Sequence, residues 1–338
     1  MQMRTPSRAP CVLAAVAVAA GLVAGCGGRS PDEPPRPRLS PATVGSPIDV
    51  GTSPVAVAVG AGAIWVVDAA RQTLVKVDPR TRAVVGAPRR VAGGPFAVAV
   101  GAGAVWVAAG DGSVHAYDPR SVRPLGPTAT VPGANGLAVE AGGIWVTSRR
   151  ARSVTRIDPR TRRADRPIRV GRDPADVAVG LGAVWVANAD GGSVSRIDPR
   201  GERAIATIAV GARQVLAVAV GEGGVWVARA GGPDAARTQL VRIDPGAGKV
   251  VGGPIAVPGA VPLDIVAGNG VWVTDSGGAL RTGSGGGVSR VDPATRRAAG
   301  PPLRAGRRPS AIALGAGGVW VADEDAGTVT PITFAPRR

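Results

Sequence analysis

Six polar residues near the ends of apolar runs are the side chains of this sequence most able to take part in chemistry. Four of them occupy the third position after a tryptophan, and two lie at the start of short apolar runs. We predict that these six form the ligand-binding set, which comprises Asp68, Asp176, Asn188, Asp264, Asp275 and Asp323. Carboxylate and amide oxygens are the ligands that Ca²⁺ prefers, so a cluster of them could hold Ca²⁺ or a cationic ligand.

A competing explanation applies to the residues that follow a tryptophan. Aspartate and asparagine at the end of a strand commonly accept hydrogen bonds from the backbone of their own turn. Asp68, Asp275 and Asp323 are therefore either candidate metal ligands or turn-forming residues. The sequence leaves both explanations open.

Few other reactive residues are present. The chain has one histidine, His115, and two cysteines, Cys11 and Cys26. A histidine-based acid–base pair cannot be built from a single histidine. We therefore predict no catalytic residue and no required cofactor, with Ca²⁺ as the one metal that the acidic residues could bind.

The tryptophans indicate how these residues are positioned. All of them lie in related apolar runs, at Trp65, Trp106, Trp145, Trp185, Trp226, Trp272 and Trp320. The intervals between them are 41, 39, 40, 41, 46 and 48 residues. A period near forty that recurs in this way indicates a repeat architecture.

Residues 174–210 illustrate one repeat. Apolar runs at 176–179, 183–187, 193–197 and 204–210 are separated by turn signals. The third turn begins with Asp198-Pro199, and the same dipeptide recurs in five other repeats. Four short antiparallel strands in about forty residues predict one propeller blade, so the expected fold is all-β, a seven-bladed β-propeller.

The two ends of the array are complementary. The last repeat has a third strand at 328–330 but no regular fourth strand, whereas residues 43–51 have the pattern of a fourth strand. We predict that the N-terminal strand completes the last blade and closes the ring, because closure removes exposed sheet edges. The propeller domain is then expected over residues 42–338.

A family resemblance supports this fold. Trp185-Val186-Ala187-Asn188, with the later pattern Ser-Val-x-Arg-Ile-Asp-Pro, resembles the YVTN family of β-propeller repeats, and the resemblance covers about residues 42–334. It implies little about function, since such propellers include binding proteins, sensor domains and some enzymes. Virginiamycin B lyase-like propellers have a similar repeat form, but their chemistry relies on several histidines, which His115 alone does not match. Lactonase-type propellers hold a metal with carboxylates and asparagine near the axis, and that alternative stays open.

The N-terminus has the features of a lipoprotein signal. Arg4 and Arg8 precede an apolar stretch at 11–23, and Val23-Ala24-Gly25-Cys26 resembles the bacterial lipobox. We expect residues 1–25 to be a signal peptide and Cys26 to be lipidated, although an ordinary secretory signal would also explain the pattern. Residues 26–41 are expected to form a proline-rich tether that spans up to roughly 45 Å. The predicted location is the extracytoplasmic face of the cell membrane, with the lipid as the membrane contact.

The formal net charge of +16 has two explanations. Only Lys76 and Lys249 are lysines among 40 basic residues, and this bias indicates a high-GC genome. The alternative is a basic surface for anionic lipid or wall polymer. Nucleic-acid binding would need exposed aromatic residues among the basic ones, and the aromatics here belong to the repeat core. We predict a monomer with no specific nucleic-acid partner.

The predicted function is non-catalytic. We expect a binding or scaffold module for a ligand, an envelope polymer or a partner protein, acting through the face that carries the loops at 230–239 and 276–287. The alternative is a metal-dependent lactonase, hydrolase or lyase-like enzyme that uses an acidic cluster near the central axis. The sequence does not identify the ligand.

Overall fold

The computed structural model describes residues 39–140, 142–211, 214–230, 238–258, 261–275 and 286–335. The chain divides into two compact units, Met1–Arg36 and Pro37–Arg338, and the described residues belong to the second. The predicted signal peptide, Cys26 and most of the predicted tether lie outside the described residues. Within the described ranges no helix is long and apolar enough to cross a membrane.

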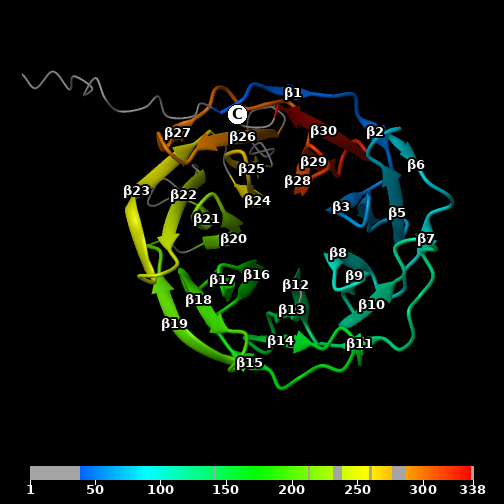
Figure 1. Cartoon of the computed structure of the whole chain (residues 1–338), viewed down its shortest axis with the longest axis horizontal. Coiled ribbons are helices and arrows are strands. Elements are labelled where there is room, and N and C mark those ends of the chain that lie inside the picture. Colours follow the sequence, from blue (N-terminus) through cyan, green and yellow to red (C-terminus); the bar gives the residue numbers. More distant parts are fainter. Residues whose placement is uncertain are drawn as a thin grey trace, which may run out of the picture. The chain divides into compact units, whose positions relative to one another are not determined.

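The second unit is a ring of seven antiparallel sheets, which confirms the predicted seven-bladed β-propeller (Figure 1). Each blade begins with an innermost strand at the central axis, followed by a second strand that contains the tryptophan. The innermost strands are β3 (Pro54–Gly60), β8 (Pro95–Gly101), β12 (Ala134–Glu140), β16 (Pro174–Gly180), β20 (Gln214–Gly221), β24 (Pro262–Ala267) and β28 (Pro309–Gly315). The second strands are β4 (Ala63–Asp68), β9 (Ala104–Ala109), β13 (Gly143–Ser148), β17 (Ala183–Asn188), β21 (Gly224–Ala230), β25 (Val271–Asp275) and β29 (Gly318–Asp323).

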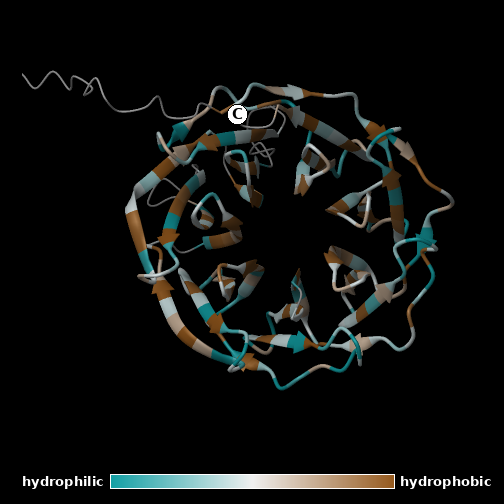
Figure 2. Ribbon diagram, in the orientation of Figure 1, coloured by the Kyte–Doolittle hydropathy of each residue, from teal (hydrophilic) through white to brown (hydrophobic). Residues whose placement is uncertain are grey.

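The outer half of each blade is less regular. The third strands are β5 (Thr73–Asp78), β10 (Ser113–Tyr117), β14 (Ser153–Ile157), β18 (Ser193–Asp198), β22 (Thr238–Asp244), β26 (Gly287–Asp292) and β30 (Thr328–Phe334). The outermost strands are β6 (Ala83–Val84) with β7 (Arg89–Arg90), β11 (Ala129–Thr130), β15 (Ile168–Arg169), β19 (Arg203–Ala209), β23 (Lys249–Val257), β27 (Arg297–Ala298), and β1 (Ala42–Val44) with β2 (Ile48–Asp49). Figure 2 shows hydrophilic residues concentrated in the peripheral turns and hydrophobic residues on the inner strands.

The tryptophans hold each blade together and fill the space between blades. Their side chains are almost completely buried; Trp185, for example, has no exposed surface. Among the described residues, the indole N–H in six blades donates to the carbonyl oxygen of the glycine that ends the innermost strand or directly follows it, as from Trp185 to Gly180 at 3.1 Å. A buried indole needs such a partner. The basic residue opposite on the third strand covers the ring in four blades, as Arg196 does over Trp185.

The turns follow the chemistry expected from the sequence. Leu181 and Gly182 both have positive φ, which is the two-residue hairpin turn that suits twisted strands. In each Asp-Pro turn the aspartate carboxylate accepts backbone N–H bonds from residues further along the turn, as Asp158 does from Arg160 and Thr161. These backbone bonds lower the pKa of Asp158 from its ordinary value.

The N-terminal strand closes the ring, as predicted. β1 and β2 both pair with β30, from Ala42 opposite Phe334 to Asp49 opposite Thr328. β30 is therefore longer than the predicted third strand at 328–330. The two short strands are separated at 45–47, where Gly45 still donates its N–H to the carbonyl of Pro331.

The strand directions define two faces of the ring. We call the side with the second-to-third loops and the connections between blades the loop face. We call the opposite side, with the first-to-second and third-to-fourth turns, the turn face. Pairing of Pro54 with Asp68 places the start of each innermost strand on the loop face, and pairing of Ala42 with Phe334 places the start of β1 on the turn face.

Candidate functional site: a pocket at the central axis

A β-bulge occurs near the start of all seven innermost strands. In β3 the pairing partner shifts between Pro54 and Ala56, and the same irregularity recurs in the other six blades. Bulges change the direction in which side chains point. Two successive residues, such as Val55 and Ala56, therefore line the same cavity instead of alternating between the two faces of the sheet.

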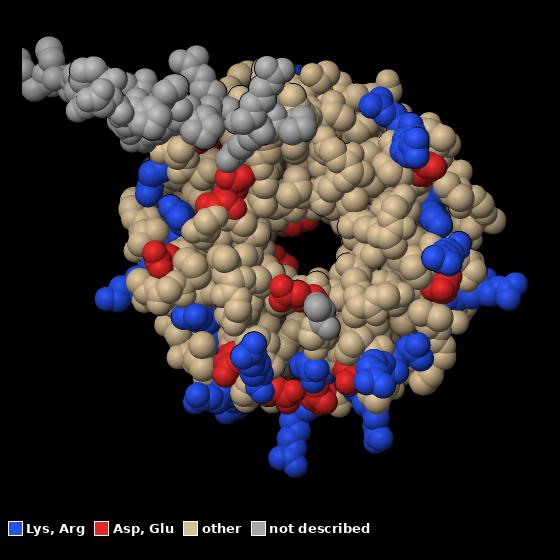
Figure 3. Space-filling model, in the orientation of Figure 1, with Lys and Arg blue, Asp and Glu red and all other residues tan. Residues whose placement is uncertain are grey.

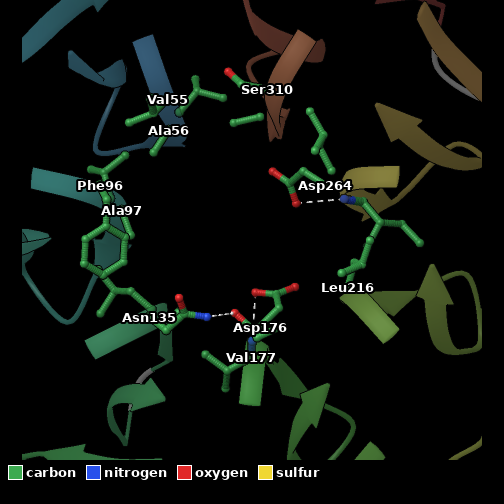
Figure 4. Close-up of a pocket in the computed structure, with 18 of the residues that line it drawn as sticks. Val55, Ala56, Phe96, Ala97, Asn135, Asp176, Val177, Leu216, Asp264 and Ser310 are labelled. Carbon is green, nitrogen blue, oxygen red and sulfur yellow. Dashed lines mark hydrogen bonds between the residues drawn. The ribbon is translucent and has the colours of Figure 1, made fainter. Parts of the chain in front are cut away.

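These bulged segments surround a cavity of about 330 Å³ at the central axis, which we call the axial pocket (Figure 4). Its apolar wall includes Phe96, Leu216 and Leu263, and its polar groups come from four blades. The polar residues are Asn135, Asp176, Asp264 and Ser310. Figure 3 shows carboxylates inside the central opening, whereas Lys and Arg side chains on the face shown lie mostly toward the rim.

Asp176 occupies the second bulged position of β16. Its carboxylate accepts a hydrogen bond from its neighbour Val177, at 2.8 Å, and another from Val218 of the next blade, at 2.9 Å. Burial raises the pKa of Asp176 to about 6, against the opposing effect of these two N–H donors. The side chain thus links two innermost strands and also faces the pocket.

Asp264 repeats this arrangement two blades further on. Its carboxylate accepts from Ile265 at 2.7 Å and from Ile312 of the next blade at 2.9 Å. Burial and then the negative charge of Asp176 raise the pKa of Asp264 to about 7. The two carboxylates therefore interact across the pocket, and both titrate near neutral pH.

The other two polar side chains also connect adjacent blades. The Asn135 amide donates to the carbonyl oxygen of Ala175 at 2.8 Å, and the Ser310 hydroxyl donates to that of Pro54 at 2.9 Å. Blades three to five are therefore linked at the pocket, and so are blades six, seven and one. Each of these polar side chains therefore links two adjacent blades and also lies on the pocket wall.

Asp68 and Asp323 lie away from the axis, at the ends of their second strands, and are fully buried. Asp68 accepts backbone N–H bonds from the incoming connection at Thr52 and from its own turn at Arg71. Asp323 accepts from four backbone groups, at Arg307, Arg308, Asp325 and Ala326. Each carboxylate thus fixes the connection that enters its blade.

The remaining predicted residues have separate surroundings. Asp275 accepts a hydrogen bond from the Thr238 hydroxyl of the preceding blade at 3.1 Å. The Asn188 amide donates to Ser193 and Ser195 within its own blade. The structure brings only Asp176 and Asp264 of the six candidates to one cavity. Across the ranges it describes, no three His, Cys, Asp or Glu side chains are grouped as a metal site.

His115 lies on β10, the third strand of its blade, away from the axial pocket. Its ring is within hydrogen-bond distance of the Ser113 and Thr128 hydroxyls. Burial lowers its pKa from the ordinary value, against the opposing charge of Asp111.

Sequence reasoning missed the pocket residues Phe96, Asn135, Leu216, Leu263 and Ser310. Phe96, Asn135, Leu216 and Ser310 lie ten residues before the tryptophan that follows, and Leu263, like Asp176, lies nine residues before it. The variation at the tenth position was the available signal, because the seven repeats carry seven different residue types there, namely Val55, Phe96, Asn135, Ala175, Leu216, Pro262 and Ser310. Loops 230–239 and 276–287 are mostly outside the described residues.

No protein-family model and no curated protein matches the sequence. Solved structures do match the fold. Virginiamycin B lyase from Staphylococcus aureus is 15% identical, with a TM-score of 0.73, over 87% of this chain and 100% of that chain. A streptogramin B lyase is 14% identical, with a TM-score of 0.72, over 87% and 98%. Kuenenia stuttgartiensis hydrazine synthase is 14% identical, with a TM-score of 0.69, over 85% and 97%.

At this level of identity the comparisons establish the propeller fold and no activity. One further match is a S. aureus virginiamycin B lyase variant that holds quinupristin and is described as catalytically inactive after replacement of a histidine by alanine. In the present chain the single histidine lies outside the axial pocket. The comparison with these lyases therefore establishes a shared fold.

Proposed function

We propose that this protein is a lipid-anchored, extracytoplasmic propeller that binds a small ligand in the axial pocket without converting it. The observation that carries the proposal is the pocket itself, whose volume of about 330 Å³ lies at the lower end of the range for small-molecule sites. Its accessible surface is mostly polar, with a smaller apolar part, and the polar side chains are held in place by bonds between blades.

The pocket favours a ligand with a hydrogen-donating or cationic group and a small apolar part. Phe96, Leu216 and Leu263 offer apolar surface, and Asp176 and Asp264 offer carboxylate oxygens. Above about pH 7 both carboxylates are ionised, because their pKa values are about 6 and about 7. An organic ammonium ion is therefore preferred over a carboxylate, and this preference should increase as the pH rises.

The test compares benzylammonium with benzyl alcohol by isothermal titration calorimetry. We expect tighter binding of benzylammonium, more so at alkaline pH than at acid pH. Leu216→Ala removes part of the apolar wall without removing a hydrogen bond between blades, and we expect it to weaken binding about twofold. Asp190→Asn is the matched control, because Asp190 is exposed and lies outside the pocket.

Equal affinity for both probes in wild type, or equal affinity of wild type and Leu216→Ala for benzylammonium, would contradict binding in this pocket. If the protein in the same preparation still fractionates with membranes, the lipid-anchor part of the proposal is retained. A scaffold role in an envelope complex would instead appear as a crosslinked partner protein whose capture is unaffected by Leu216→Ala.

A second candidate function is an enzyme that uses the two axial carboxylates. The observation in its favour is that Asp176 and Asp264 titrate near neutral pH, which suits general acid–base catalysis. A panel of lactones and esters, assayed with and without added divalent metal, tests it. Turnover that Asp264→Asn abolishes in a folded protein would support the enzyme; binding without turnover would support the first proposal.

A further inference from the structure

The turn face carries an excess of positive charge on its six Asp-Pro turns. These turns contain twelve Lys and Arg residues against seven Asp and Glu, in residues 78–82, 118–123, 158–163, 198–203, 244–249 and 292–297. Most of the basic side chains are exposed, including Arg120, Arg160, Arg163 and Arg200. Positive charge therefore recurs around most of the rim on this face.

The basic residues of these turns are not neutralised by ion pairs. Among the residues that the structure describes, none of them forms an ion pair, and the turn aspartates are occupied by backbone N–H donors. Glu202 is paired instead with Arg156 of the neighbouring blade, at 3.2 Å. On the loop face Arg149 pairs with Asp173 and Arg308 pairs with Glu324. The exposed loop-face residues Arg150 and Arg172 form no ion pair with any described residue, so the difference between the faces is one of degree.

The N-terminal segment joins the ring on this same face. The backbone carbonyl of Ser40 accepts a hydrogen bond from Arg290, which also binds the carbonyl of Asn269 in a first-to-second turn. Ala42 then begins β1 opposite Phe334. The first described residues of the chain therefore join the ring at the turn face, and the axial pocket lies among the strand starts on the loop face.

We propose that the turn face docks on an anionic phospholipid surface and thereby directs the loop face away from the membrane. This inference rests on the lipid anchor at Cys26, which is part of the proposed function. A tether of up to roughly 45 Å would otherwise allow every orientation. Arginines near an anionic surface contribute favourably to binding, and the effect falls off within one Debye length, about 10 Å at moderate salt. The charge and the entry point of the chain thus favour one orientation.

The experiment uses the full lipidated protein reconstituted into vesicles of phosphatidylcholine, with or without phosphatidylglycerol. Arginine modification by phenylglyoxal, read by mass spectrometry, reports the accessibility of each side chain. We expect Arg160 and Arg200 to be protected severalfold in vesicles that contain phosphatidylglycerol. The loop-face residues Arg150 and Arg172, which are also exposed, should react equally in both. High salt should remove the protection.

A charge variant provides the second measurement. Replacement of Arg160, Arg163, Arg200 and Arg203 by glutamine should abolish the protection of Arg120, which stays in place on the same face. Glutamine substitution of Arg150, Arg152, Arg169 and Arg172, on the loop face or at its rim, is the matched control and should not. Each arginine that reaches the surface should change the partition roughly fivefold.

The outcomes separate the two proposals. Failure to reconstitute into phosphatidylcholine vesicles would overturn the lipid anchor. Reconstitution with equal reactivity of Arg160 in both vesicle types would overturn docking and leave the anchor intact. Protection of the loop-face arginines, or salt-insensitive protection on the turn face, would also overturn this inference. If a soluble anionic polymer protects the turn-face arginines and vesicles do not, the inference is also overturned.

Discussion

Replacement of Asp264 by asparagine should change how the stability of the ring depends on pH. The unfolded chain releases this proton near the ordinary pKa of 3.8, whereas the folded protein keeps it until about pH 7. Stability is therefore lost as the pH rises through this window and is constant above it. The shift of about three units corresponds to at most about 4 kcal/mol.

Most of this loss of stability falls in a pH range in which unfolding is readily measured. From about pH 5 to about pH 8 the wild type should lose up to ~3 kcal/mol of stability through Asp264. This is an upper value, because the residue keeps some exposure to the axial pocket. Asparagine cannot titrate, so the variant should lose much less over the same range, even if its stability at pH 5 is lower because it accepts fewer N–H bonds.

Urea unfolding at several pH values, followed by the fluorescence of the buried tryptophans, measures the difference. Asp190→Asn, at an exposed position of the loop face, controls for a general effect of removing a charge. Parallel pH profiles for the wild type and Asp264→Asn would refute the argument that burial keeps this carboxyl group protonated near neutral pH.

Four other outcomes are expected, three from contacts described above and one from the predicted lipobox. Asp176→Asn should lower the pKa of Asp264 because it removes a neighbouring charge, and ¹³C NMR titration of the Asp264 carboxyl would show it. Asp323→Ala should cost roughly 2–3 kcal/mol with or without Ca²⁺, since four backbone N–H groups lose their acceptor; a Ca²⁺-dependent loss would indicate a metal site. Deletion of residues 42–51 should cost several kcal/mol and cause aggregation by exposing β30, and an unchanged melting temperature would refute ring closure. Cys26→Ala should release or misprocess the protein, and unchanged membrane fractionation would exclude lipid anchoring.

The architecture could be predicted because its determinants repeat. The spacing of Trp185 and its counterparts indicates the number of blades. Each buried indole N–H also needs a hydrogen-bond acceptor, which is found within its own blade, as Gly180 is for Trp185. The predicted runs at 183–187 and 193–197 agree with β17 and β18 within one residue. The incomplete last repeat indicates closure, whereas the single strand predicted at 43–51 is divided into β1 and β2 by residues 45–47, which include Gly45 and Pro47.

The site could be predicted only in part, because it depends on irregular features. A bulge has no clear sequence signature, so the side chains of Leu216 and Asp264 could not be assigned to one cavity from strand alternation. The position of Asp68 was correctly placed at a strand end. Its partner Thr52, however, lies 16 residues earlier in an incoming connection, and such a contact is visible only after the blades are assembled.

The strand that closes the ring is also the strand on which any pull from the N-terminus acts. Ala42, at the turn-face end of β1, is where the chain enters the sheet, and β1 runs antiparallel to β30. Force applied through a membrane anchor would act along β1 and load its hydrogen bonds to β30 together, in shear, instead of opening them one at a time. The mechanical strength of the attachment and the integrity of the propeller would then depend on the same few hydrogen bonds.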